Sequence, residues 1–338
     1  MARGIPRRFF ILSAGMDGLR GYLIKSDKSC SHVETLSVLE SATAPDTKLL
    51  WLDIQGELSE EVEAELSRVL GWHPIVLENF HLASSRPKLI NFDRYSQVTL
   101  HALNLDRPHE ERLTIEIDIV IAKTYLITYH KHPVRSIEET LEDLREGRLV
   151  SLGADELLYH IVSHGIDKYT PAIEGKKDLI AALEQEALYS PGQDLLERIV
   201  LLRDEVIELG VVMTPQQLIL SQMATGVCRH VRPFIRPYFK DAESRMRNLI
   251  DELNSYKEML ANSLELYRSA MSSRTNGTMT VLTAMSALFL PLTFLTGLFG
   301  MNVNLPLAHQ NHAFIFIVVL CLTSFVGMMA YFKIKSWF

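Results

Sequence analysis

Apolar and polar positions follow two different periods along the first part of the chain. Runs rich in β-branched and aromatic residues predict short strands, whereas Ser59–Leu70 has apolar residues at helical spacing behind a serine cap. Residues 1–150 are therefore expected to form a mixed α/β domain. The predicted strands are Phe9–Leu12, Leu49–Ile54, Gln97–Leu103, Thr114–Ile121 and Tyr125–Tyr129.

Beyond this region the pattern becomes helical. Asp155–Tyr189 and Asp194–Val212 predict two long helices, and the Ser-Pro-Gly breaker at residues 190–192 suits an antiparallel pair. A third helical segment is expected after Pro215.

The next segment predicts one very long helix, because Gly277 is the only glycine, and no proline occurs, between Pro237 and Pro291. If continuous, this helix spans roughly 80 Å at 1.5 Å per residue and carries the chain into the membrane without a break. Apolar residues spaced by three and four, flanked by charged ones, predict a packing seam along it. The seam consists of Met246, Leu249, Leu253, Tyr256, Leu260, Leu264, Tyr267 and Met271.

Two apolar stretches, Met279–Leu298 and Ala313–Phe332, are each long enough to cross a hydrocarbon core of ~30 Å. Residues 275–332 contain no Asp, Glu, Lys or Arg. Arg274 precedes the first stretch, Lys333 and Lys335 follow the second, and the loop between them has no Lys or Arg. The positive-inside rule therefore places both termini in the cytoplasm of a protein that crosses the membrane twice. A buried hairpin of a soluble protein is the less favoured alternative.

The first span carries small polar side chains on one face, separated by larger apolar ones. Polar groups in hydrocarbon are costly unless they face protein or water, so this stripe indicates either a helix–helix contact or a pore wall. Periodicity leaves both alternatives open. Two spans cannot enclose a pore, so the channel interpretation requires a homo-oligomer with the first span innermost. The stripe consists of Asn276, Met279, Thr283, Ser286, Leu290 and Thr293.

Composition and motifs exclude several classes of function. The net charge of -7 and the lack of a basic cluster with interleaved aromatics argue against a nucleic-acid partner. The 3 cysteines form no C-x-x-C pair and indicate a reducing compartment. His160 and His164 have the i, i+4 spacing of metal ligands without the glutamate of a zincin motif, so a packing or surface role is favoured. No phosphate-binding loop or nucleophile motif is present, and neither an enzyme nor a cofactor is expected.

The triplet Gly300-Met301-Asn302, directly after the first span, resembles the signature of the CorA superfamily of divalent-cation transporters. Its position at the outer end of the penultimate span is more specific than the triplet itself. The resemblance extends over nearly the whole chain. It includes Pro291-Leu292-Thr293-Phe294, Trp72-His73-Pro74, Arg86-Pro87-Lys88, Thr275-Asn276 and the basic-aromatic tail Lys333–Phe338.

The resemblance implies a funnel-shaped homopentamer in an inner (plasma) membrane. An N-terminal α/β/α domain (1–150) would precede a helical region with a long stalk (151–274) and a transmembrane hairpin (275–338). The triplet would sit at the outer mouth and hold a largely hydrated cation, with Gly300 permitting a tight turn and Asn302 presenting amide oxygens to first-shell water. Met279 and Leu290 are the candidate apolar constrictions, and Asn276, Thr283 and Thr293 are the candidate polar rings.

Family members with a regulatory cytoplasmic metal hold it with an acidic pair that spans neighbouring subunits. One position matches Asp241, but the other is occupied by Asn79 where an aspartate is expected. This departure weakens the prediction of metal-controlled gating, although Glu78 or Glu243 could substitute.

The outer loop, Val303–His312, has no carboxylate and instead offers His309 and His312. Imidazole suits Zn²⁺, Co²⁺ or Ni²⁺ better than Mg²⁺, which points to the ZntB-like, zinc-handling branch, whereas the intact Met301 points away from it. The sequence therefore predicts a transporter of Zn²⁺ and/or Mg²⁺, Co²⁺ and Ni²⁺. The competing hypothesis is a non-conducting, membrane-anchored oligomeric metal sensor or scaffold.

Overall fold

The computed structural model describes residues 19–25, 30–33, 36–44, 46–81, 86–105, 113–149, 153–301 and 313–335. The chain divides into two compact units. The first comprises Met1–Leu183 with Glu197–Ala261, and the second comprises Glu184–Leu196 with Asn262–Phe338. The strand predicted at Phe9–Leu12 lies outside the described residues.

A seven-stranded sheet forms the centre of the first unit, in the order β2-β1-β3-β7-β6-β5-β4 among the described residues. Neighbouring strands are antiparallel except for β3 and β7, which are parallel, with Leu50 opposite Tyr125. The four predicted strands that fall within the described residues are confirmed. The strands are β1 (Leu19–Lys25), β2 (Cys30–Val33), β3 (Thr47–Gln55), β4 (Lys88–Asn91), β5 (Tyr95–Leu103), β6 (Thr114–Ala122) and β7 (Tyr125–His130).

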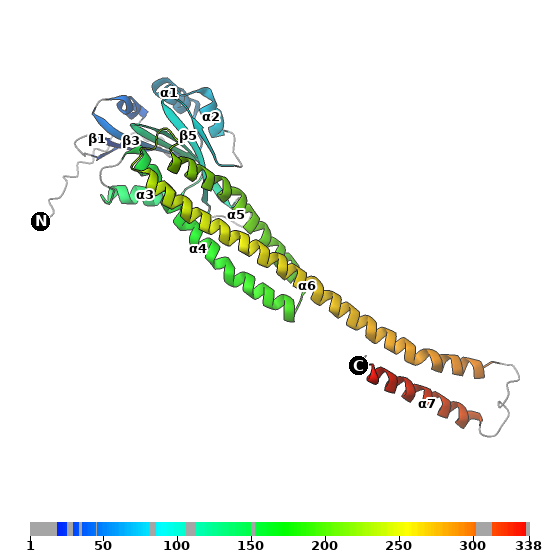
Figure 1. Cartoon of the computed structure of the whole chain (residues 1–338). Helices are drawn as coiled ribbons and strands as arrows, with labels where there is room; N and C mark the ends of the chain where they lie inside the picture. The colour runs from blue at the N-terminus through cyan, green and yellow to red at the C-terminus, as the bar shows by residue number, and fades with distance from the viewer. Residues whose placement is uncertain are drawn as a thin grey trace. The chain divides into compact units, whose positions relative to one another are not determined.

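Two short helices, α1 (Glu60–Leu70) and α2 (Pro74–His81), cover one face of this sheet (Figure 1). The predicted serine cap is confirmed, because the Ser59 hydroxyl accepts a hydrogen bond from the Val62 N–H at 3.4 Å. The apolar faces of both helices meet the inward-facing strand residues in one core, whose buried members include Leu66, Val76, Leu50, Val120 and Ile127.

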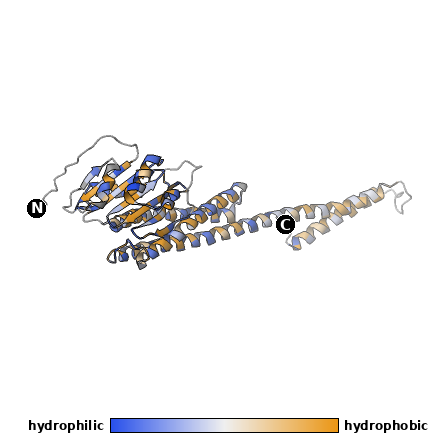
Figure 2. Cartoon of the chain, turned by 90° about the horizontal axis from the view of Figure 1, so that it is seen from above, coloured by the Kyte–Doolittle hydropathy of each residue, from blue (hydrophilic) through white to orange (hydrophobic). Residues whose placement is uncertain are grey.

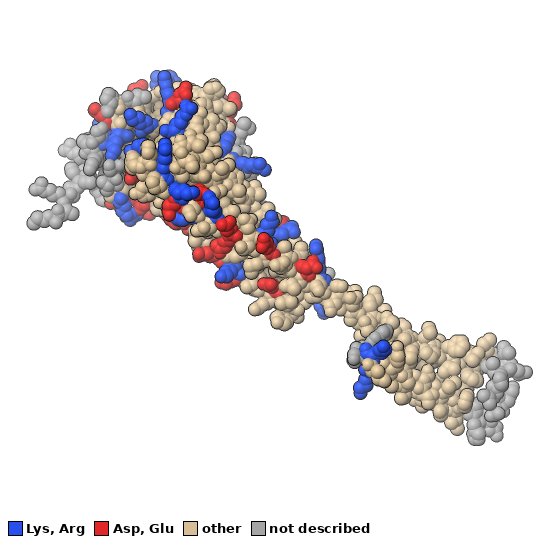
Figure 3. Space-filling view, viewed as in Figure 1, with Lys and Arg blue, Asp and Glu red and all other residues tan. Residues whose placement is uncertain are grey.

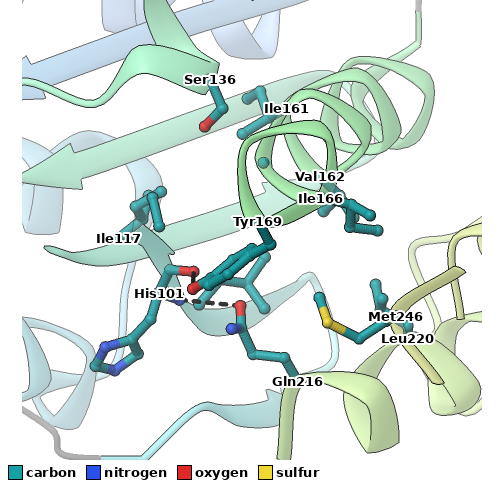
Figure 4. Close-up of a pocket in the computed structure, with 13 residues that line it drawn as sticks. His101, Ile117, Ser136, Ile161, Val162, Ile166, Tyr169, Gln216, Leu220 and Met246 are labelled. Carbon is teal, nitrogen blue, oxygen red and sulfur yellow. Dashed lines mark hydrogen bonds between the residues drawn. The ribbon is translucent and has the colours of Figure 1, made fainter. Parts of the chain in front are cut away.

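Three further helices, two of them long, cover the other face of the sheet: α3 (Arg135–Arg145), α4 (Ala154–Tyr189) and α5 (Gln193–Thr225). Polar contacts join them to β5, where the His101 N–H donates to Gln216 at 3.1 Å and the Tyr169 hydroxyl donates to the His101 carbonyl at 2.9 Å (Figure 4). A mostly apolar cavity of about 30 Å³ remains beside this contact, which is too small for a metabolite. The predicted α/β/α arrangement is confirmed.

The helix α5 runs through Pro215, so the separate helix predicted after this proline was wrong. A proline inside a helix removes one backbone hydrogen bond and costs about 3 kcal/mol, which is not enough to end a helix that is well packed on both sides. Met213, before Pro215, and Ile219, after it, are both buried. Similarly, α4 continues through Pro171.

The long helix is confirmed as α6, Arg236–Phe299, with 64 residues. The predicted seam is buried from Met246 to Leu260 within the first unit. Towards its end α6 also passes through Pro291.

In the second unit, α6 pairs with α7 (Ala313–Ile334), and both helices are long and apolar enough to cross a membrane (Figure 2). Ala284 and Leu288 of α6 pack against Phe332 of α7, and all three are buried. Charged side chains are absent from the described part of α6 beyond Arg274 and occur on α7 only near its end, where Lys333 lies (Figure 3).

Candidate functional site

The polar stripe lies on the face of α6 that points away from α7. Ser286 follows the buried contact residue Ala284 by two positions, and Leu290 follows Leu288 by two. Two positions correspond to about 200° around a helix with 3.6 residues per turn. Since the other stripe residues share the phase of Ser286 and Leu290, α7 covers one side of α6 and leaves the stripe uncovered.

The exposure of the stripe confirms that the single chain does not bury it. Met279 is 59% exposed and Leu290 is 74% exposed, although both are large apolar residues. Asn276, Thr283, Ser286 and Thr293 are also exposed. The face is therefore available to lipid, to another copy or to a water-filled axis.

The hydroxyl of Thr293 donates back to the Phe289 carbonyl at 2.9 Å, one turn earlier. This bond satisfies the hydroxyl hydrogen inside the helix, so the threonine oxygen keeps a lone pair for a partner outside it. Such an oxygen can accept a hydrogen bond from the hydration water of a cation.

The signature triplet begins directly after α6. The Gly300 N–H donates to the Thr296 carbonyl at 2.9 Å, and a Cβ added at Gly300 would lie 3.0 Å from that same carbonyl oxygen. Gly300 is not among the glycines with positive φ. The glycine is therefore explained by a close backbone approach rather than by the expected tight turn that only glycine could adopt.

The rest of the predicted mouth is only partly described. Met301 follows the helix and is 55% exposed. Asn302, His309 and His312 lie outside the described residues, so their predicted roles remain predictions.

At the predicted cytoplasmic metal site, Asn79 binds other side chains of the same chain. Asn79 is buried, and its amide oxygen accepts a hydrogen bond from the Lys88 ammonium at 2.7 Å, while its amide nitrogen donates to Gln97 at 2.9 Å. Both the oxygen and the nitrogen of the Asn79 amide are thus hydrogen-bonded, and the partner of the oxygen is a lysine side chain. Asp241 and Glu78 are both exposed.

Glu243, the other predicted substitute, is buried among cationic groups. Arg247 donates to one of its oxygens and Lys240 lies 2.7 Å from the other. The hydrogen bonds from Arg247 and then Lys240 lower the pKa of Glu243 to about 2. Its charge is therefore already balanced within the chain, which disfavours a role as a metal ligand.

Among the described residues, no group of three or more His, Cys, Asp or Glu side chains is placed to hold a metal ion. His164 contacts Asp143 at 2.9 Å and so joins α4 to α3, in line with the packing role favoured for it. Burial, followed by the charge of His164, lowers the pKa of His160.

Sequence reasoning missed two polar groups that organise the first unit. Lys88 was noted only as part of a motif, and its contact with Asn79 depends on the packing of α2 against β4. The second group is centred on buried Asp53, which Arg20 contacts at 2.6 Å and His130 at 3.1 Å. Burial opposes ionisation, but the interactions with His130 and Arg20 outweigh it and lower the pKa of Asp53. Only the sheet register brings these three residues together.

A family model described as "CorA-like Mg2+ transporter protein" matches residues 46–334, and the chain belongs to this family. Family members are membrane transporters of divalent cations and not enzymes. The chain is 27% identical over 310 residues to a protein named cobalt/magnesium transport protein CorA from Thermotoga maritima, covering 91% of this chain and 87% of that protein.

Solved structures show the same fold. The complete structure of the CorA magnesium transporter from Methanocaldococcus jannaschii matches with a TM-score of 0.81 at 20% identity, covering 97% of this chain and 100% of that chain. The ZntB cytoplasmic domain from Vibrio parahaemolyticus matches with a TM-score of 0.60 at 16% identity, covering 76% of this chain and 100% of that chain. The predicted fold class is thereby confirmed.

Proposed function

We propose that this chain forms a homopentameric channel through which hydrated divalent cations cross an inner (plasma) membrane. The observation that carries the proposal is the position of the polar stripe on the face of α6 opposite the α7 contact. A ring of copies with α6 inside and α7 outside gives each helix face a suitable environment: lipid for the apolar surface of α7 and water for the stripe.

The stripe would then line the pore with alternating polar and apolar rings of side chains. Asn276, Thr283 and Thr293 supply rings of polar groups that can bind hydration water, whereas Met279 and Leu290 supply apolar rings that stop conduction by dewetting when the pore is narrow. The triplet Gly300-Met301-Asn302 forms the outer mouth in this proposal. Because Mg²⁺ loses its water reluctantly, amide oxygens that bind the hydrated ion suit it better than a dry cage of ligands.

Both termini lie in the cytoplasm in this proposal. Support comes from Arg274 before the first span and from Lys333 and Lys335 after the second, because basic residues are retained on the cytoplasmic side. The outer loop then faces the opposite side of the membrane.

We further propose that cytoplasmic metal does not gate this pore through the position of Asn79. The Lys88 side-chain nitrogen, 2.7 Å from the Asn79 oxygen, takes the position beside this oxygen that a metal ion would need. Flux in proteoliposomes should then be unaffected by millimolar Mg²⁺ added on the cytoplasmic side. Strong inhibition by that Mg²⁺ would contradict this part of the proposal.

The decisive experiment measures divalent-metal uptake into liposomes that contain only this protein. Asn302→Ala should abolish flux without changing the oligomer, and Leu290→Ala should raise flux because a wider apolar ring is easier to wet. Leu322→Ala on α7 is the matched control for the leucine, since Leu322 is 57% exposed on the other helix, and its flux should equal that of the wild type.

The sensor or scaffold hypothesis predicts a different result from the same experiment. A protein that assembles into a defined oligomer yet carries no metal flux would support it. Native mass spectrometry of the oligomer completes the test, because an even-numbered assembly would contradict the pentamer.

A further inference from the structure

An open cavity of about 650 Å³ lies in the second unit, between the segment that joins α4 to α5 and one face of α6. Its volume falls within the range of about 300–1,000 Å³ that is usual for ligand sites. Hydroxyl groups and one guanidinium line much of it, from Tyr189, Ser190, Ser273 and Arg274. Among the described residues that line the cavity there is no carboxylate, so its donors and its single charge suit an anion.

Arg274 is the charged group of this cavity. Its side chain is exposed, and within the described part of the chain no carboxylate pairs with its guanidinium. A guanidinium presents two parallel N–H groups that match two oxygens of a phosphate. The hydroxyls of Ser190 and Ser273 line the same cavity and can donate to the remaining phosphate oxygens.

Arg274 also lies at the edge of the apolar span. Met279, where the apolar stretch of α6 begins, follows Arg274 by five residues, which is about 7.5 Å along the helix axis. The headgroup layer of a bilayer adds about 5–7 Å to each side of the hydrocarbon core. The long side chain of an arginine can extend into that layer from its outer edge. The guanidinium is therefore at the level of lipid headgroups.

The last turn of α4 shows a second feature of a membrane interface. Tyr189 is 83% exposed and Leu188 is 51% exposed, and both line the cavity opposite α6. Tyrosine is enriched where a protein meets lipid headgroups, because its ring is apolar and its hydroxyl is polar. An exposed tyrosine and leucine beside the arginine favour a lipid over a soluble anion.

We propose that this cavity binds the phosphate headgroup of an anionic phospholipid, with the Arg274 guanidinium on the phosphate and the Ser190 and Ser273 hydroxyls as further donors. The lipid belongs to the leaflet at the Arg274 end of the span, which is the cytoplasmic leaflet in the topology proposed above. That leaflet carries a negative surface potential from its anionic lipids. The inference rests on this topology and not on ion conduction. A bound lipid ties the α4–α5 segment to α6 at the membrane surface.

Native mass spectrometry of the full-length protein, stripped of lipid in detergent, tests the site. Dioleoylphosphatidylglycerol should bind at one tight site per chain, and dioleoylphosphatidylcholine, which has the same acyl chains but no net charge, should bind more weakly. Arg274→Gln should weaken phosphatidylglycerol binding by about tenfold or more, because hydrogen bonds to a charged group are lost.

Two matched controls separate this site from diffuse attraction to a basic surface. Arg268→Gln removes an exposed cation of the same helix that does not line the cavity, and it should leave the affinity unchanged. Lys333→Gln removes an exposed cation at the end of α7 and should weaken binding by about fivefold at most, the effect of one basic residue near an anionic surface. Equal losses in Arg274→Gln and Lys333→Gln would overturn the site.

A second pair of variants tests the shape of the cavity with its charge intact. Ala270→Phe fills the cavity and should weaken phosphatidylglycerol binding several-fold, whereas Ser269→Phe, at an exposed neighbour that does not line it, should not. Displacement of the lipid by submillimolar inorganic phosphate would assign the cavity to a soluble anion and overturn the proposal. None of these outcomes depends on metal flux, so a failed lipid site and a failed channel are distinguishable.

Discussion

Asp118 lies on β6 in the middle of the sheet and is 3% exposed. The Thr99 hydroxyl donates to its carboxyl group at 2.6 Å, and the charge of Lys88 also favours the ionised form. Burial outweighs both interactions and raises the pKa of Asp118 to about 6. The folded protein therefore binds this proton more tightly than the unfolded chain does.

This shift predicts how the stability of the first unit depends on pH. Because the folded-state pKa is raised, the contribution of Asp118 to the free energy of unfolding falls as pH rises from about 4 to above 6. Asp118→Asn should remove this dependence and raise the free energy of unfolding at pH 7 by about 2 kcal/mol.

Thermal unfolding in detergent between pH 4.5 and 7.5 measures the effect. Asp93→Asn is the control, because the side chain of Asp93 is 99% exposed and its removal should leave the pH profile unchanged. An Asp118→Asn variant with the wild-type slope would show that another group sets the pH dependence.

At the scale of residues, the sequence shows which functional group stands at a position, but it does not show which other residue that group contacts. The substitution of Asn79 for an expected aspartate is visible in the sequence, but the hydrogen bond from Lys88 depends on how α2 meets β4 and β5. A tight turn was the predicted reason for glycine at position 300. The structure gives a different reason, because a Cβ there would lie close to the Thr296 carbonyl oxygen, and this contact cannot be predicted from the sequence.

The contact between α6 and α7 depends on the small side chain of Ala284. Ala284 is fully buried against α7, and apolar helices in a membrane rely on close packing because lipid is as apolar as their side chains. Ala284→Leu should overpack the contact and cost about 1–3 kcal/mol.

Met285→Leu is the matched control, because Met285 is the next residue along the helix, is 50% exposed and would change little in volume. The melting temperature of the purified oligomer is the measurement. Equal melting temperatures for the two variants would show that α7 can move to accommodate the larger side chain.

Some elements could be predicted from their hydrophobic pattern, and others could not, whatever their length. The strands β3, β5, β6 and β7 and the helices α1, α4 and α6 follow their patterns. The elements β1, β2, β4, α2 and α3 were not predicted. The strand β1 contains Arg20 and Gly21, which weaken its strand pattern, and it is fixed by pairing with β2 and β3 on either side. The run of α5 through Pro215 likewise depends on tertiary packing.

Whether the stripe residues line a pore depends on the oligomer. Stripe residues that are exposed in one chain become a pore wall only if several copies surround an axis, so the sequence and the fold of one chain predict the stripe but not its occupant. The metal carried belongs to this same scale, since it depends on rings of identical residues.

We expect Zn²⁺ to be carried slightly better than Mg²⁺, with Co²⁺ and Ni²⁺ also carried. The outer loop lacks carboxylates, and His309 and His312 attract borderline cations while their imidazoles are neutral. Zn²⁺ flux should therefore decrease as pH falls below about 6, and Mg²⁺ flux should not.

Side-by-side uptake of the two metals by the wild type and by a His309→Ala/His312→Ala double variant is the measurement. The double variant should lose the pH dependence of Zn²⁺ flux and keep its Mg²⁺ flux. Mg²⁺ flux without Zn²⁺ flux in the wild type would reverse the expected preference, and unchanged Zn²⁺ flux in the double variant would remove any role for these histidines.

The parallel pairing of β3 with β7 has a consequence for biosynthesis. The sheet cannot be completed until residue 130 has left the ribosome, and the first apolar span begins about 145 residues later. At roughly 5–20 residues per second, the cytoplasmic sheet has about 7–30 s to fold before the hydrophobic segment that directs the chain to the membrane emerges. A variant whose sheet folds slowly would therefore reach the membrane with unpaired strands, and it should accumulate as aggregates rather than as a mislocalised but folded protein.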